Sequence, residues 1–154
     1  MAGHQLAHVN VARFLRPRSD PANAPFLSAL AAVNAAADGG DGLVWRFVAD
    51  EADEADRRLA ADPHSLLNLS VWTDPGALRD FTYRDPLHRA MMRRRREWFD
   101  RLEVRLALWW VPAGTRPSLR DAVERLAVLG RLGPTAEAFT FARAFDPTGA
   151  AVPS

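Results

Sequence analysis

The stretch Asn68-Leu69-Ser70-Val71-Trp72 decides both the expected fold and the expected site. It is typical of a β-strand, whose side chains point alternately to the two faces of a sheet. The amide, the hydroxyl and the indole then share one face, and the aliphatic side chains share the other. Two hydrogen-bonding groups beside an indole suit a small-molecule pocket better than a solvated sheet surface. We therefore expect this face to line a pocket.

The residues around this stretch predict alternating strands and helices, from apolar spacings of two for strands and of three or four for helices. Strands are expected at residues 5–14, 43–48, 66–73, 104–111 and 138–143. Helices are expected at residues 24–37, 75–101 and 119–129, and the second should bend at Asp85-Pro86 because proline interrupts helical hydrogen bonding. The stretch 50–63 is expected as a surface excursion with room for a short helix, in which Asp53, Glu54 and Asp56 are solvated.

The predicted order, β-α-β-β-α-β-α-β, favours an α+β fold. Its first six elements are the split βαβ arrangement of a ferredoxin-like sheet, and right-handed crossovers would place both helices on one face. We expect one domain at residues 1–145 and a loose tail at residues 146–154. The other face would carry apolar side chains that are unsuited to water, among them Val9, Val11, Leu67, Leu69 and Val71. Packing two such sheets together predicts a homodimer, as in a dimeric α/β barrel.

Composition narrows the classes of protein. The chain has 154 residues, no cysteine and a formal net charge of +1, which argues against disulfides, thiolate metal sites and a general affinity for nucleic acid. No apolar stretch approaches the ~20 residues of a membrane span, and no basic segment precedes a short apolar one as in a signal peptide. We expect a cytoplasmic protein with no membrane partner.

The run from Arg93 to Arg96 would usually suggest a polyanion site. However, four consecutive helical residues point in directions about 100° apart. We therefore expect most of these arginines to face solvent with surface ion pairs, and one of them to turn inward.

The chain resembles the dimeric α/β-barrel superfamily across about residues 5–143, and it is most similar to an uncharacterised bacterial branch. The resemblance rests on Asn68 to Trp72, on Phe81-Thr82-Tyr83 with His88 and 94–99, on 108–114, and on Gly133-Pro134 with 138–141. Within the superfamily, antibiotic biosynthesis monooxygenases that act on polyketide anthrones use oxygen without metal or flavin. The resemblance implies that Asn10, Asn68 and Trp72 match their site, with Arg95 or a near neighbour as the arginine.

The candidate site combines these residues with others expected to face the pocket. Asn68 and Trp72 lie four residues apart, about 13 Å along a strand, so a small aromatic molecule could span them. Amides could stabilise an enolate, Trp72 could stack on the ring, and His88 could act as a base because imidazole titrates near neutral pH. The alternative is that Asn68 and Ser70 are satisfied core polar groups and Trp72 fills the core. The expected substrate contacts are Asn10, Ser70, Tyr83, Trp110 and His8.

Two further functions stay open. Haem-degrading members of the superfamily use a tryptophan on the helix after the third strand and a histidine as iron ligand. Here Phe81 stands at the tryptophan position and Met91 near the histidine position, with His88 about one turn away, so haem is the weaker expectation and neither a cofactor nor a metal site is predicted. A non-catalytic binding or stress-response dimer is the other alternative, because no acid or base is firmly matched. Of Trp109 and Trp110, which must face opposite ways, one should line the pocket and the other the dimer core.

Overall fold

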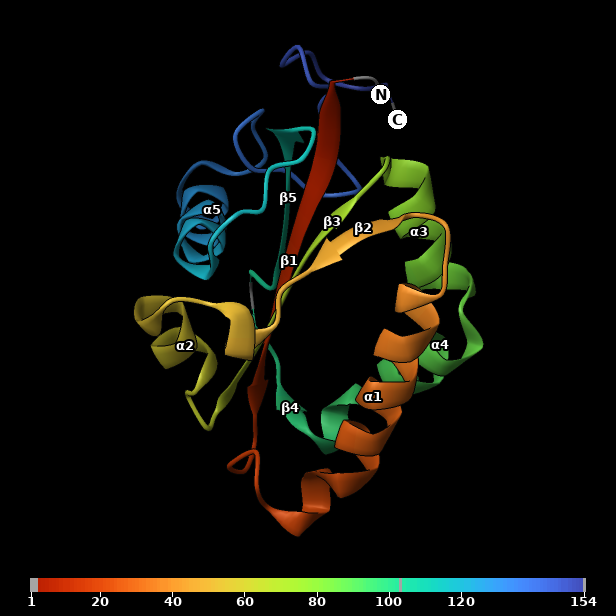
Figure 1. Cartoon of the computed structure of the whole chain (residues 1–154), viewed down its shortest axis with the longest axis vertical. Coiled ribbons are helices and arrows are strands. Elements are labelled where there is room, and N and C mark those ends of the chain that lie inside the picture. The colour runs from red at the N-terminus through yellow and green to blue at the C-terminus, as the bar shows by residue number, and fades with distance from the viewer. Residues whose placement is uncertain (1–2, 103, 154) are drawn as a thin grey trace.

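The computed structural model describes residues 3–102 and 104–153 and shows an α+β fold (Figure 1). The α+β prediction is confirmed. The strands are β1 (His4–Phe14), β2 (Leu43–Arg46), β3 (Ser65–Trp72), β4 (Phe99–Asp100) and β5 (Leu106–Pro112). The helices are α1 (Ala24–Asp38), α2 (Glu54–Ala60), α3 (Pro75–Arg84), α4 (Pro86–Arg93) and α5 (Leu119–Leu132). No helix among the described residues is long and apolar enough to cross a membrane.

The strands form one antiparallel sheet with β1 at its centre. Strand β3 pairs with one edge of β1, and β2 pairs with the far edge of β3. The other edge of β1 pairs with β5 over its first seven residues and with β4 at Arg13 and Phe14. The register places His8 opposite Ser70 and Asn10 opposite Asn68. Because directly opposed residues share a face, this register gathers four polar side chains on one face of the sheet.

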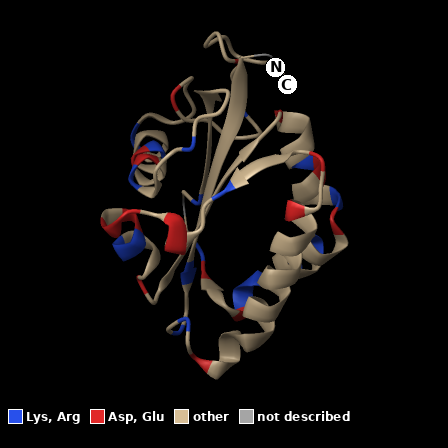
Figure 2. Cartoon of the chain, in the orientation of Figure 1, with Lys and Arg blue, Asp and Glu red and all other residues tan. Residues whose placement is uncertain are grey.

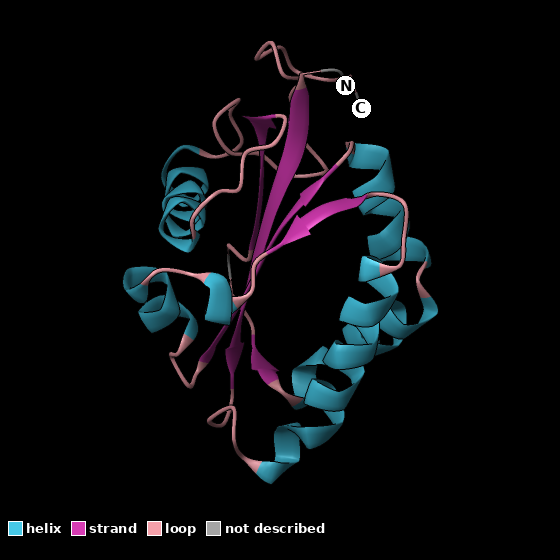
Figure 3. Cartoon of the chain, viewed as in Figure 1, coloured by secondary structure: helices cyan, strands magenta, loops and turns pink. Residues whose placement is uncertain are grey.

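Helices cover both faces of the sheet (Figure 3). The face with Val9, Leu69 and Val71 packs against α5, through buried Leu119, Ala122, Val128 and Leu129, with α2 alongside. The opposite face looks toward α1, α3 and α4 (Figure 1). The expectation that the first face would be bare, and would need a partner sheet, was therefore wrong. The helix at 119–132 returns over that face and buries it within one chain.

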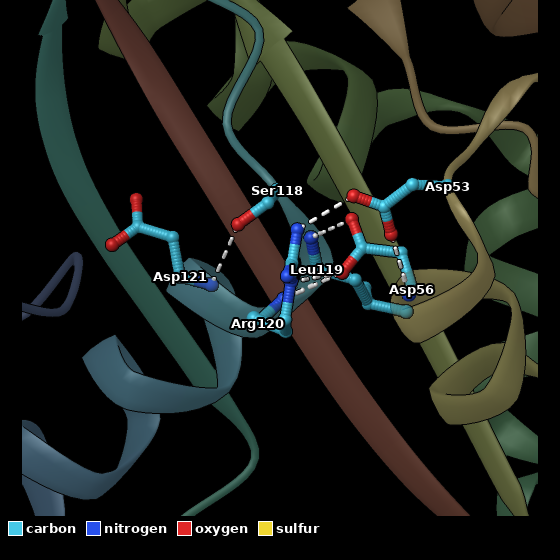
Figure 4. A network of polar contacts seen from close by, with 6 residues as sticks. All are labelled: Asp53, Asp56, Ser118, Leu119, Arg120 and Asp121. Carbon is cyan, nitrogen blue, oxygen red and sulfur yellow. Dashed lines mark hydrogen bonds and ion pairs between the residues drawn. The ribbon is translucent and has the colours of Figure 1, made fainter.

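A buried carboxylate anchors α5 at its first turn (Figure 4). Asp56, which is 5% exposed, accepts hydrogen bonds from Leu119 N at 2.9 Å and from Arg120 N at 3.2 Å. Ser118 caps the helix by accepting from Asp121 N at 3.0 Å, a common role for serine at this position. The carboxylate also pairs with the Arg120 guanidinium. Asp56 is thus a structural residue linking α2 to α5, and the expectation of a solvated loop charge was wrong for it.

The second predicted helix ends earlier than expected. The helix expected at 75–101 does break at Asp85, but its second half ends at Arg93 and is followed by a 3-10 helix at Arg95–Glu97. The chain must turn there because Phe99 pairs with Phe14 in the sheet and its ring lies 4.7 Å from that of Phe26. That aromatic packing overrides local helix propensity.

The C-terminal segment also differs from its expected form. The strand expected at 138–143 is reduced to two isolated bridges, of Phe139 with Leu108 and of Ala138 with Thr135. The chain then turns at once, with Thr140 Oγ1 accepting from Arg143 N. The segment expected as a loose tail folds into a turn closed by a bridge between Phe145 and Ala151. The carboxylate of Asp146 holds that turn by accepting from Thr148 N and Ala150 N.

Candidate functional site

A cavity of about 900 Å³ lies between the polar face of the sheet and the helices α1, α3 and α4. Strands β1 and β3 supply one wall, and α4 with the segment that follows it supplies much of the other. The predicted site residues that line this cavity are His8, Asn10, Asn68, Ser70, Trp72, Tyr83, His88 and Arg95. The fold therefore brings together groups that lie as far as 87 positions apart in the sequence.

Three side chains on the sheet form a hydrogen-bonded chain. The indole of Trp72 donates from Nε1 to Ser70 Oγ at 2.8 Å, and Ser70 Oγ lies 3.3 Å from His8 Nδ1. All three residues are buried. Since Ser70 accepts from Trp72, its own proton is available for His8 Nδ1. In that arrangement the ring proton of His8 is on Nε2 and can be donated to a ligand.

Burial keeps His8 neutral. Desolvation is the main cause that lowers the pKa of His8 from 6.5 to about 4, and charge on the neighbouring His88 lowers it further. At neutral pH, His8 is therefore a hydrogen-bonding group and not a cation.

This buried histidine predicts a pH-dependent stability. Between pH 6.5 and about 4 the unfolded chain takes up a proton at His8 that the folded chain does not, so the free energy of unfolding falls as the pH falls through this window. The full effect is about 3 kcal/mol. Urea unfolding of the wild type and of His8→Gln at pH 7 and pH 4.5 measures it. The variant should lose much of the decrease, and an equal decrease in both proteins would contradict a neutral His8.

Two amides form a second polar pair further along the same strands. Asn68 Nδ2 donates to Asn10 Oδ1 at 2.9 Å, and both residues are half-buried. This bond uses one donor of Asn68 and the oxygen of Asn10. The Nδ2 donors of Asn10 and the Oδ1 acceptor of Asn68 are then available to a ligand.

His88 lies across the cavity from this sheet wall, on α4. Its backbone N–H is capped by Asp85 at 2.8 Å, and its Nδ1 donates to the carbonyl oxygen of Thr82 at 2.8 Å. A carbonyl can only accept, so this bond fixes the proton of a neutral ring on Nδ1. The Nε2 atom is then the basic nitrogen. His88 is thus oriented by its own local structure for proton abstraction or ligand binding.

Aromatic rings link the two walls. The Phe81 ring centroid lies 5.4 Å from that of Trp72 and 5.7 Å from that of His88. These tilted ring contacts pack the three rings against one another across the cavity. An aromatic ligand would find ring surfaces and polar groups side by side.

The arginine run divides between the cavity and the surface. Arg95 and Arg96 line the cavity. Arg94 pairs with Glu97 at 2.7 Å and lies 4.8 Å above the centroid of Trp98. The sequence predicted that one arginine of the run turns inward, whereas the structure has two that line the cavity.

Comparison with known proteins places the chain in a family. The sequence pattern of the family described as "Domain of unknown function (DUF3291)" matches residues 5–153. The chain belongs to this family. No curated protein matches it significantly.

Two solved structures are similar to this DUF3291 chain. The crystal structure of PA3566 from Pseudomonas aeruginosa has a TM-score of 0.50 and 11% identity, covering 75% of this chain and 99% of its own. NE2512, a protein of unknown function from Nitrosomonas europaea, has a TM-score of 0.47 and 11% identity, covering 76% of this chain and 96% of its own. At this identity the likeness to PA3566 concerns the fold alone.

The DUF3291 chain places Trp110 away from the cavity lining. Its Nε1 donates to the carbonyl oxygen of Phe145 at 2.8 Å, so Trp110 holds the C-terminal turn against β5. Trp109 is buried on the opposite face, under α5. That face was expected to be a dimer core, and it is instead the core of one chain.

Sequence reasoning missed several lining residues of this family member. Arg46, Arg101, Arg105 and Phe141 all line the cavity. Arg46 is opposite Ser70 in the β2–β3 pairing, which the sequence does not specify. Arg101 and Phe141 lie in segments whose secondary structure was predicted wrongly, and Arg105 lies directly before β5. Of the four, only Arg46 lies in a predicted element that the structure confirms at that residue, the strand expected at 43–48 and observed as β2 (Leu43–Arg46).

Proposed function

We propose that this DUF3291 chain is a cofactor-independent monooxygenase acting on a small, electron-rich aromatic molecule of the phenol or anthrone type. The observation that carries the proposal is that one cavity holds a sheet wall of His8, Asn10, Asn68 and Trp72 and, opposite it, the oriented imidazole of His88. The sheet order β2-β3-β1-β5 supports the assignment to a ferredoxin-like architecture. The proposal includes a cytoplasmic location and a homodimer, whose contact would use a surface other than the one beneath α5.

The chemistry would begin with proton removal. His88 Nε2 takes a proton from the acidic carbon or hydroxyl of the substrate, and Asn10 Nδ2 and His8 Nε2 donate hydrogen bonds to the enolate oxygen that results. The electron-rich enolate reduces oxygen, and oxygen adds at the same carbon. Loss of water then converts a CH₂ group and one O₂ into a carbonyl group and one H₂O, which balances atoms and electrons. Trp72 and Phe81 would hold the ring in place.

An oxygen electrode tests this proposal. Protein treated with a chelator is mixed with anthrone at pH 6.5, and the rate of uptake is compared with buffer and with heat-denatured protein. We expect enzyme-dependent uptake with one anthraquinone formed per oxygen consumed. Catalase should return no oxygen, because water and not hydrogen peroxide is the product. Uptake equal to buffer across anthrone and hydroquinone substrates would contradict the proposal.

A specific observation favours haem binding as a second candidate. Donation from Nδ1 to a carbonyl leaves His88 Nε2 basic, which is how histidines that bind metals are commonly oriented. The lining arginines suit the propionates of a haem. Bound haem would supply one-electron and oxygen chemistry. Titration with haemin distinguishes the candidates, since a Soret band that is lost in His88→Ala would favour haem and no band would reject it.

A further inference from the structure

Arginine side chains gather around the cavity. Arg95, Arg96, Arg101 and Arg105 line it from the segment between α4 and β5, and Arg46 lines it from β2. Among the described lining residues, Asp100 is the single carboxylate that accompanies them. The whole chain carries a formal charge of only +1, so positive charge is concentrated here. In Figure 2 the ribbon is blue, the colour of Lys and Arg, at the end of β2 and before β4. These two basic segments lie on either side of the space between the sheet and α1.

Two of the neighbouring basic side chains already have partners. Arg46 bridges the sheet edge to the end of α1 through Asp38 at 2.9 Å. Arg94, which precedes the lining pair, is bound to Glu97. Within residues 3–102 and 104–153, the structure gives Arg95, Arg96, Arg101 and Arg105 no ion pair. Four exposed cations around one cavity repel each other, and an anion among them would relieve that repulsion.

The cluster lies at one end of the polar wall. Val11 N donates to the carbonyl oxygen of Arg105 at 2.9 Å, and Arg13 pairs with Asp100 in the sheet. The arginines are therefore next to the Asn10 end of β1. Trp72 is at the other end, where it pairs with Leu6. Since Trp72 and Asn68 are about 13 Å apart along β3, an aromatic molecule that stacks on Trp72 would direct its far end toward the arginines.

We propose that the aromatic ligand of this cavity carries a carboxylate at the end remote from its reacting ring, an inference that rests on the proposed function. Guanidinium groups bind carboxylates through paired hydrogen bonds. The hydroxyl end of the ligand lies near His8, His88 and Trp72, and the carboxylate lies among Arg95, Arg96, Arg101 and Arg105. The arginines thus select for an acidic aromatic and set its direction in the cavity.

Calorimetric titration of the full chain, without oxygen, tests this specificity with two matched probes. The compound 6-hydroxy-2-naphthoate has a hydroxyl and a carboxylate at opposite ends, and 2-naphthol lacks the carboxylate. We expect the acid to bind about 10-fold more tightly at low salt, a modest factor because the arginines are exposed and screened. The advantage should shrink as salt is raised.

A double variant and a matched control complete the test. Arg95→Gln with Arg96→Gln should reduce the advantage of the acid to within about 3-fold and leave the affinity for 2-naphthol unchanged. Arg93→Gln, from the same run but outside the lining, should keep the full advantage. Equal affinities for the two probes, no binding of the acid at millimolar concentration, or an equal loss in Arg93→Gln would overturn the proposal. If the chain binds the acid more tightly than 2-naphthol but consumes no oxygen in the electrode assay, the carboxylate site is retained and the monooxygenase proposal is rejected.

Discussion

Leu69→Arg should abolish cooperative folding of the chain. Leu69 is 1% exposed and packs in the core that α5 closes. The substitution removes a buried leucine, which costs about 2–5 kcal/mol, and places an unpaired charge beneath α5, which costs several more. A domain of this size is stable by about 5–15 kcal/mol. We therefore expect insoluble protein, or a circular dichroism melt without a sharp transition.

The matched control is Leu132→Arg, on the same helix that covers Leu69. Leu132 is 62% exposed, so this variant should melt within a few degrees of the wild type. Light scattering of both variants shows whether the apolar face is buried beneath α5 or between two subunits. A well-folded Leu69→Arg monomer, derived from a wild-type dimer, would show that this face lies between subunits and not beneath α5.

His88→Gln should lower oxygen consumption by about 100- to 1,000-fold, the range expected when a general base is lost. Glutamine can keep a hydrogen bond to the Thr82 carbonyl through its amide but cannot accept a proton at neutral pH. Asn68→Ala should lower the turnover number by about 10-fold or more, because one polar group near the enolate is lost and Asn10 loses its partner. Initial rates with anthrone measure both effects.

His64→Gln is the control for these rates, since His64 lies in the turn before β3 and is absent from the cavity lining. It should leave the rate unchanged. Full activity in His88→Gln with an unchanged melting temperature would remove His88 from the mechanism. The amides and Trp72 could then be only binding groups.

The sequence predicted the polar wall well because strand periodicity is local. Once 66–73 is a strand, Asn68, Ser70 and Trp72 must share a face, and the same holds for His8 and Asn10 on the first strand. The break at Asp85-Pro86 was equally readable, because it depends on the chemistry of one proline. These features require no knowledge of distant contacts.

The errors came from contacts between distant segments. To predict that the Leu69 face is covered, one must know that α5 packs back onto it. That packing depends on the Asp56 carboxylate, which caps α5 from 63 positions earlier in the sequence. The early end of α4 depends on Phe99 packing with Phe14 and Phe26. The position of Arg46 depends on the β2–β3 register. Spacing along the sequence encodes none of these.

The central claim is that the cavity between the polar sheet face and α1, α3 and α4 binds a small aromatic acid, and indole NMR signals test it most directly. The chain has five tryptophans, and Trp72 and Trp109 lie on opposite faces of the sheet. On titration of ¹⁵N-labelled protein with 6-hydroxy-2-naphthoate, the Nε1–H signal of Trp72, assigned with Trp72→Phe, should shift and saturate while that of Trp109 stays in place. Saturable binding that leaves the Trp72 signal unmoved, or that moves Trp109 as much, would contradict the account.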